Sequence, residues 1–143
     1  MKDVYVLSAV RSPIGGFDGS LSGVEPIELG KTVMKEAVTR SGIDSSQISS
    51  VVVGNCIPTD SRSPYLSRVI AINSGLPHKS SAVTINRLCG SAMQAIVSTA
   101  QGVMLGDYSA GIGGGVEVMS KGGFLSPDMR HGKRMGNAKM IDM

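Results

Sequence analysis

Residues 82–92 read AVTINRLCGSA: an apolar run, a turn that contains Cys89, and the start of a second apolar run. The first run, Ala82–Ile85, contains β-branched residues and predicts a buried strand. The second run, Ala92–Leu105, is apolar nearly all round and is followed by Gly106. It predicts a helix that lies deep inside the protein and ends at the glycine.

The same alternation of strand and helix continues on both sides of this unit. The further predicted strands are residues 4–10, 51–54 and 110–116, and the further predicted helices are residues 26–41 and 66–73. Pro26 suits the first position of a helix, and Gly42 suits the residue that follows one. The order β-α-β-α-β-α-β predicts an α/β fold with a parallel or mixed sheet and right-handed crossovers.

The periodic pattern stops beyond residue 120. Residues 121–143 hold glycines, methionines and basic residues without a helical or alternating repeat. We therefore expect residues 1–120 to form an incomplete core and residues 121–143 to form a loop excursion. The net charge of +3 arises in this last segment. No aromatic or arginine-rich pattern accompanies its basic residues, so no nucleic-acid partner is predicted.

The composition indicates a packed protein with extra buried surface. Of the 143 residues, 41% are hydrophobic and 17% are charged, whereas about 25% charged residues is usual. So few charges favour a sheet covered on both faces or a subunit contact. No targeting signal and no apolar stretch approaching ~18 residues is evident, so no membrane contact is expected. Two cysteines make no disulfide framework, and we expect a cytoplasmic protein.

Cys89 is the candidate nucleophile because it stands where a strand turns directly into a helix. This placement resembles a nucleophile elbow, in which a sharp turn presents the side chain and helix amides surround it. The positive end of the helix dipole favours the thiolate, and Gly90 permits a tight turn and close approach of a ligand. The alternative is an inert buried cysteine, which is common for this residue type. The spacing alone leaves both interpretations open.

The other chemistry-bearing residues carry weaker signals. Cys56 follows a strand without a helix after it and is interpreted as structural, while His78 and His131 lie in predicted loops. Neither C-x-x-C nor H-E-x-x-H occurs, so no metal site is predicted. The glycine run 111–115 fails the G-x-G-x-x-G pattern, because Val116 stands at its last position. Glycines there are expected to permit close backbone packing.

Several motifs match one family when the chain is taken as a whole. They are NRLCGS at 86–91, GGGVEVMS at 113–120, VRSPIG at 10–15, YLSRV at 65–69, RMG at 134–136 and MID at 140–142. As a set they resemble the thiolases, the acetyl-CoA acetyltransferases and β-ketothiolases, in register over essentially all 143 residues. The resemblance implies a thiolase-like fold, of which this chain is the amino-terminal half-domain with the start of the loop domain.

The resemblance also implies a chemistry. Cys89 would accept an acyl group from acetyl-CoA or a 3-ketoacyl-CoA as a thioester, and its backbone N–H would help to form an oxyanion hole. Coenzyme A and acyl-CoA would be substrates in fatty-acid metabolism, and no cofactor is expected. The residue matching Met135 reaches over the pocket of an opposing dimer, so Met135 is a candidate substrate contact. Self-association as a dimer or tetramer is expected, in part through residues 124–140.

Three family motifs do not occur in these residues: the histidine of G-H-P, the second cysteine of C-x-G and the asparagine of N-E-A-F. Reversible Claisen condensation of acetyl-CoA to acetoacetyl-CoA, or thiolysis of 3-ketoacyl-CoA, would then need a carboxy-terminal thiolase part. We expect the isolated chain to be inactive. One alternative is a truncated or two-chain-assembly fragment with a structural or interaction role. A ketoacyl-synthase-like condensing enzyme is another, against which residues 113–120 argue.

Overall fold

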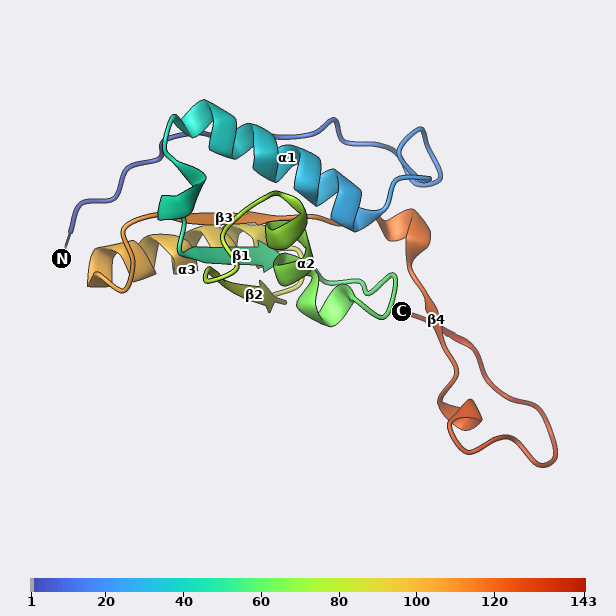
Figure 1. The fold of residues 1–143 in the computed structure, drawn as a ribbon. Coiled ribbons are helices and arrows are strands. Elements are labelled where there is room, and N and C mark those ends of the chain that lie inside the picture. Colours follow the sequence, from blue (N-terminus) through green and yellow to red (C-terminus); the bar gives the residue numbers. More distant parts are fainter. Residues whose placement is uncertain (1) are drawn as a thin grey trace.

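A three-stranded parallel sheet forms the centre of the computed structural model, which describes residues 2–143 (Figure 1). Its strand order is β2-β1-β3. The strands are β1 (Ser50–Gly54), β2 (Ser81–Ile85) and β3 (Gly111–Gly115). Gly54 pairs with Ile85 on one side and with Gly115 on the other. Because all three strands are parallel and in register, their carboxyl ends meet at one edge of the sheet.

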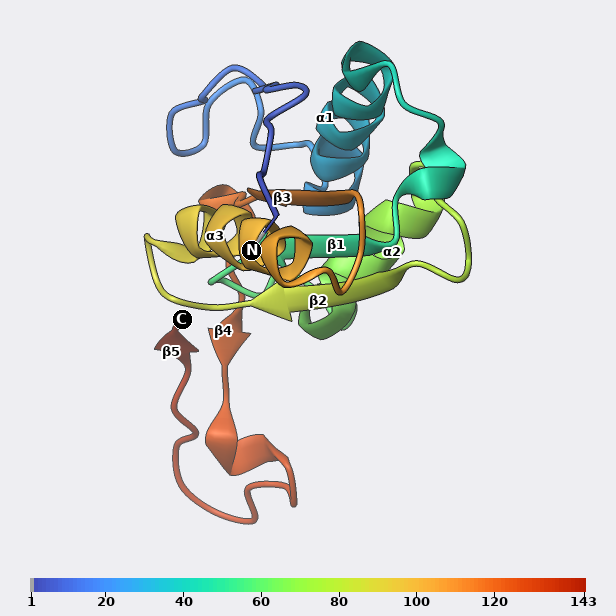
Figure 2. The same cartoon turned by 90° about the vertical axis from the view of Figure 1, so that its left-hand side faces the viewer.

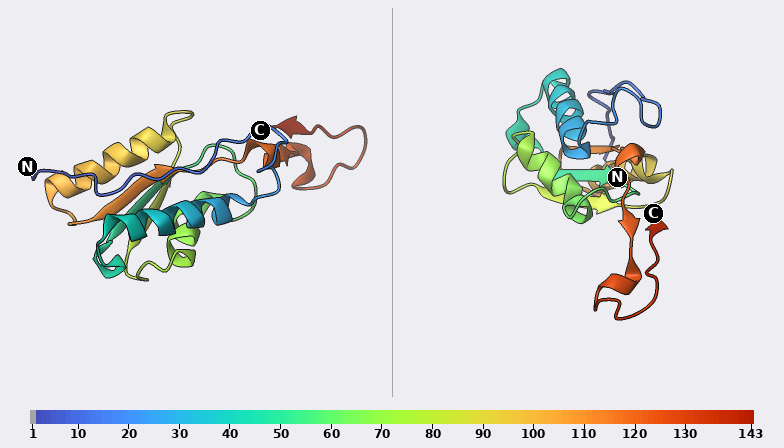
Figure 3. Two further views of the ribbon diagram at one scale, coloured as in Figure 1. Left: turned by 90° about the horizontal axis from the view of Figure 1, so that it is seen from above. Right: turned by 90° about the vertical axis from the view of Figure 1, so that its right-hand side faces the viewer.

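Helices cover the two faces of the sheet, as the view from above shows (Figure 3). Helices α1 (Pro26–Ser41) and α2 (Leu66–Asn73) lie on one face, and α3 (Ser91–Leu105) lies on the other. The predicted helix signals are confirmed, since Pro26 opens α1 and Gly42 follows it with a left-handed φ of 71°. Short 3-10 helices η1 (Ser45–Gln47) and η2 (Ser63–Tyr65) precede β1 and α2. The predicted α/β class is therefore confirmed.

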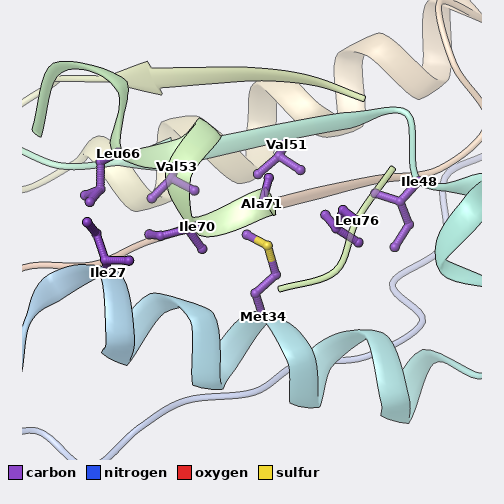
Figure 4. Packing of buried hydrophobic residues seen from close by; sticks show 9 residues of the cluster. All are labelled: Ile27, Met34, Ile48, Val51, Val53, Leu66, Ile70, Ala71 and Leu76. Atoms are coloured by element: carbon purple, nitrogen blue, oxygen red, sulfur yellow. The ribbon is translucent and has the colours of Figure 1, made fainter. Parts of the chain in front are cut away.

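The hydrophobic core lies between the sheet and the first two helices (Figure 4). Its fully or almost fully buried members come from both helices, from β1 and from the adjoining loops: Ile27, Met34, Ile48, Val51, Val53, Leu66, Ile70, Ala71 and Leu76. Gly30 of α1 allows the close packing, because a Cβ atom there would lie 2.5 Å from Cδ1 of Ile70. The core fixes β1, the central strand, and hence the position of its carboxyl end.

The strand predicted at Val4–Val10 does not form. These residues have no regular secondary structure and pair with no strand of residues 2–143, and Val6 is 82% exposed. The anchors of this segment are Lys2, whose amide donates to the Met104 carbonyl (3.1 Å), and Ser8, whose hydroxyl donates to the Ala37 carbonyl (2.7 Å). An apolar β-branched run predicts strand propensity, but a strand also needs a hydrogen-bonded neighbour.

Helix α3 is confirmed, but its predicted deep burial is wrong for this chain. Its small residues Ala95 and Thr99 are buried against β3, and Gly102 is buried against the Tyr108 side chain. In contrast, Met93 is 64% exposed and Ile96 is 47% exposed. The segment Leu88–Leu105 is also long and apolar enough to cross a membrane by length and composition alone. The expectation that no stretch reaches this length is therefore wrong, although a core helix passes the same test.

Residues 122–143 extend away from the sheet as an arm (Figure 2). The 3-10 helix η3 (Met119–Lys121) leads into it, and its short elements are β4 (Phe124–Leu125), η4 (Pro127–Met129) and β5 (Ile141–Asp142). Strands β4 and β5 pair antiparallel, so the arm returns towards the sheet. Both strands are exposed, and the structure shows the arm as a hairpin without a core of its own.

Candidate active site

Cys89 lies between the carboxyl end of β2 and the first turn of α3. Strand β2 ends at Ile85 and α3 begins at Ser91, so residues 86–90, here called the Cys89 turn, make the whole connection. The Cys89 side chain is exposed and forms no disulfide. The predicted strand-to-helix placement is confirmed. The alternative that Cys89 is a buried cysteine is wrong for this chain, and its reactivity stays a prediction.

The tight turn is made by Leu88 and not by the glycine that sequence reasoning selected. Leu88 has a left-handed φ of 52°, whereas Gly90 has an ordinary φ of −87°. A leucine adopts this region rarely, so its surroundings must hold it there. The Leu88 amide donates to Oδ1 of Asn86 (2.9 Å), and the Gly90 amide donates to the carbonyl of Arg87 (3.1 Å).

Ser91 closes the turn from the helix side. Its buried hydroxyl accepts a hydrogen bond from the Arg87 amide (2.7 Å) and donates one to the Leu88 carbonyl (2.7 Å). The Ser91 amide donates to the same carbonyl at 3.0 Å. The amide of Cys89 itself donates to no acceptor within residues 2–143. An unused N–H beside an exposed thiol, at the amino end of a helix, is suited to stabilise an oxyanion.

Cys56 lies against this turn. Its thiol donates to the Leu88 carbonyl at 2.8 Å, and its Sγ lies 3.3 Å from Oγ of Ser91. The Asn86 side chain donates to the Cys56 carbonyl at 3.4 Å. Sequence reasoning assigned Cys56 no place near Cys89. Parallel pairing of β1 with β2 is the signal that would have found it, because the residues after both strands then share one edge.

Glu117 is a second residue that sequence reasoning missed. Its Oε1 accepts hydrogen bonds from the Asn55 side chain (2.8 Å) and the Ile57 amide (3.0 Å), and its Oε2 accepts one from the Cys56 amide (2.8 Å). The Asn55 side chain also donates to the carbonyl of Val116 (3.0 Å). Glu117 therefore ties the segment that follows β3 to the segment that follows β1.

Glycines allow α3 to approach the sheet closely, as predicted for the run 111–115, and Gly54 of β1 does the same. A Cβ atom at Gly54 would lie 2.5 Å from the backbone carbon of Ser91, and one at Gly115 would lie 2.6 Å from Cβ of Ala92. These two strand-end glycines set the position of the first turn of α3. Side chains there would displace Ser91 and with it the Cys89 turn.

The two histidines lie away from the Cys89 turn. His78 precedes β2, so the length of that strand, ~16 Å for five residues, separates it from the edge that holds Cys89. His131 and Met135 belong to the arm, where Met135 is 85% exposed. Among residues 2–143 no group of three or more His, Cys, Asp or Glu side chains could hold a metal ion.

An open cavity of about 230 Å³ adjoins the site at the carboxyl ends of β1 and β2. Asn55, Cys56, Ile85 and Asn86 line it, together with residues of the loop before α2. Ligands of parallel sheets bind beyond the carboxyl ends of the strands. The cavity and the exposed thiol of Cys89 thus lie at the edge where a ligand is expected.

The sequence of this chain is similar to proteins of one known family. Residues 4–143 match the thiolase N-terminal domain family. The chain is 49% identical over 142 residues to the β-ketothiolase BktB of Cupriavidus necator, and 40% identical over 143 residues to an acetyl-CoA acetyltransferase of the same organism. Each alignment covers 99% of this chain and 36% of the relative, so the chain spans about a third of the length of these relatives.

Solved structures give the same result. A thiolase of Ascaris suum in complex with coenzyme A superposes with a TM-score of 0.91 at 38% identity, covering 99% of this chain and 36% of that one. The acetyl-CoA acetyltransferase of Bacillus anthracis superposes with a TM-score of 0.87 at 36% identity, covering 96% of this chain and 34% of that one. The chain belongs to the thiolase family and has the fold of its N-terminal domain.

Proposed function

We propose that this chain supplies the acyl-accepting nucleophile of an acetyl-CoA C-acetyltransferase, and that Cys89 is this nucleophile. The observation that carries the proposal is the Cys89 turn: an exposed thiol and an unused amide N–H share one residue at the amino end of α3. Family membership supplies the reaction class, since the relatives are named acetyl-CoA acetyltransferases and β-ketothiolases.

The first half of the reaction needs only a few groups. The Cys89 thiolate attacks the thioester carbonyl of acetyl-CoA, and the negative charge that develops on the carbonyl oxygen is stabilised by the Cys89 N–H. When the tetrahedral intermediate collapses, the bond between the acyl carbon and the coenzyme A sulfur breaks. Coenzyme A leaves as a thiolate, and the acetyl group stays on Cys89. One thioester replaces another, so the step is freely reversible.

The second half needs proton transfer. A base must remove a proton from the methyl group of a second acetyl-CoA. The resulting carbanion attacks the carbonyl carbon of acetyl-Cys89, the bond between that carbon and the Cys89 sulfur breaks, and acetoacetyl-CoA forms as the Cys89 thiolate leaves. Losing one acid or base commonly costs 10²–10⁴-fold in rate, and His78 and His131 lie away from Cys89. We therefore propose that a carboxy-terminal thiolase part completes the site, and that the chain acts in such an assembly in the cytoplasm.

The substrate proposal rests on the solved relative from Ascaris suum, which is described in complex with coenzyme A. Coenzyme A and short acyl-CoA are accordingly the proposed ligands of this chain. Met135 stays a candidate substrate contact across a subunit boundary, because it is exposed on an arm that extends from the sheet.

A second candidate is an assembly role without activity of its own. Exposed apolar side chains favour this role, because exposed apolar patches mark sites that bind another polypeptide chain. They lie in residues 4–7 and on α3 and include Tyr5, Met93 and Ile96. The two candidates differ in whether Cys89 can be acylated.

The test is acyl trapping. The 143-residue chain is incubated with acetyl-CoA, quenched in acid and digested, and the peptides that contain Cys56 and Cys89 are analysed by mass spectrometry. The proposal predicts an acetyl group on Cys89, reversed by added coenzyme A and absent from Cys89→Ala. Acetylation of Cys56 alone, or of neither cysteine, favours the assembly role.

A further inference from the structure

The Leu88 carbonyl and the Cys89 amide belong to one peptide group, and the carbonyl is held by three donors. These are the Cys56 thiol (2.8 Å), the Ser91 hydroxyl (2.7 Å) and the Ser91 amide (3.0 Å). Because a peptide group is planar, fixing the oxygen of Leu88 also fixes the direction of the Cys89 N–H. This N–H is the proposed oxyanion donor.

We propose that Cys56 and Glu117 are positioning residues for Cys89: they hold the Leu88–Cys89 peptide so that its N–H points at the reacting carbonyl oxygen. The proposal rests on the proposed function, because it assigns these residues a role in acylation of Cys89. Neither residue needs to touch the substrate.

Cys56 is the only one of the two that contacts the turn directly. Ser91 belongs to α3 and would hold the Leu88 carbonyl in any chain with this helix start. Cys56 contributes a donor from a different element, the segment after β1. It thereby fixes the turn relative to the sheet, and its own carbonyl accepts a return hydrogen bond from the Asn86 side chain (3.4 Å).

Glu117 determines where Cys56 lies. Both carboxylate oxygens are used: one accepts the Cys56 amide, and the other accepts the Ile57 amide and the Asn55 side chain. Hydrogen bonds to a charged acceptor are the stronger kind. Glu117 is exposed, so its three contacts fill no core and their effect is to hold residues 55–57 in place.

The strain at Leu88 shows why such a device is needed. Its φ of 52° is unfavourable for a side chain of this size, and such residues relax when their surroundings no longer determine them. The Leu88 side chain is 74% exposed and cannot supply the restraint by packing. The restraint therefore comes from hydrogen bonds to its backbone.

The experiment compares two reactions of Cys89 in the 143-residue chain. Acetylation by acetyl-CoA needs the oriented N–H, whereas alkylation by iodoacetamide needs only an accessible thiolate. The two rates are measured by mass spectrometry of the Cys89 peptide. A change in their ratio therefore reports on the orientation of the Cys89 N–H and not on the accessibility of the thiol. Hydrogen exchange of the amides of residues 86–91 reports independently whether the turn is held.

The variants are Cys56→Ala, Cys56→Ser, Glu117→Ala and Glu117→Gln. The matched control is Asp44→Ala, since Asp44 also accepts a backbone amide (Ser46, 2.8 Å) but lies before the amino end of β1. We expect the ratio to fall about fivefold in Cys56→Ala, the effect of one hydrogen bond, and to fall at least as much in Glu117→Ala. Cys56→Ser restores a donor and should return the ratio to within about twofold of the unmodified chain.

Each outcome decides the proposal. A lowered ratio with faster exchange in Cys56→Ala and Glu117→Ala, rescued by Cys56→Ser and unchanged in Asp44→Ala, supports it. An unchanged ratio and unchanged exchange overturn it, and failure of serine to rescue overturns the role of the thiol. If Glu117→Ala does not fold, Glu117→Gln takes its place with one carbonyl acceptor left. If the unmodified chain is never acetylated, the proposed function fails, and hydrogen exchange still decides whether the turn is held.

Discussion

Gly113 of β3 lies against the backbone of α3, so close that a Cβ atom would come within 2.8 Å of Cα of Ile96. It would also lie 2.8 Å from the Ala95 carbonyl oxygen. The next residue, Gly114, has no neighbour within 4 Å of its would-be Cβ. The two faces of one strand therefore differ, and only the face towards α3 requires glycine.

This difference gives a matched pair of variants. Gly113→Ala should lower the free energy of unfolding by about 1–3 kcal/mol, because the methyl group must push α3 away from the sheet. Gly114→Ala should be neutral or stabilise by up to about 1 kcal/mol, since it only restricts the unfolded chain. Urea unfolding followed by circular dichroism measures both. Equal destabilisation by the two substitutions would contradict the packing.

The two cysteines should differ in reactivity towards iodoacetamide. Cys89 is exposed at the amino end of α3. Cys56 is half-buried, and its thiol donates a hydrogen bond to the Leu88 carbonyl. Reactivity follows thiolate character and access, so Cys89 should be alkylated several-fold faster. Peptide mass spectrometry of the folded chain measures this. Equal or preferential labelling of Cys56 would contradict the assignment of Cys89 as the reactive thiol.

The arm should mediate a subunit contact. Its exposed methionines Met129, Met135 and Met140 suit an adaptable contact surface. Deleting residues 124–140 should lower the assembly state measured by light scattering. An unchanged mass, or tight and salt-sensitive binding of DNA by the intact chain, would count against this role.

The exposed face of α3 should make the chain prone to associate. Met93 is 64% exposed on this face, and Met93→Lys replaces it with a residue of similar helix propensity. The substitution should reduce aggregation at a given concentration without lowering the unfolding midpoint. Gln101→Lys on the same helix is the control and should leave aggregation unchanged. Identical aggregation of both variants would show that this face is not responsible.

Much of the fold is predictable because its signals are local. Pro26 and Gly42 mark the two ends of α1, and Gly106 marks the end of α3 with a φ of 86°. The segment Val4–Val10 shows the limit of such signals. Its composition is that of a buried strand, yet it finds no partner strand within residues 2–143. Pairing depends on the rest of the fold, which local periodicity does not report.

The sequence predicts where the candidate nucleophile Cys89 lies, but it does not predict which residues hold the Cys89 turn in place. The Cys89 turn is encoded by consecutive residues, whereas Cys56 contacts the Leu88 carbonyl across 32 residues of sequence and Glu117 contacts Cys56 across 61. Their approach depends on the strand order β2-β1-β3, which brings the ends of all three strands to one edge. Leu88 shows a further limit, because its left-handed backbone is imposed by the hydrogen bonds around it.

The most direct test of the account is the consumption of acetoacetyl-CoA by the purified 143-residue chain in the presence of coenzyme A, followed by absorbance. Cys89 is the proposed nucleophile, and the proposed proton-transfer groups are not among these residues. We therefore predict no sustained turnover, even where Cys89 becomes acylated. Turnover at an ordinary enzyme rate of ~1 per second or more, abolished by Cys89→Ala, would contradict it.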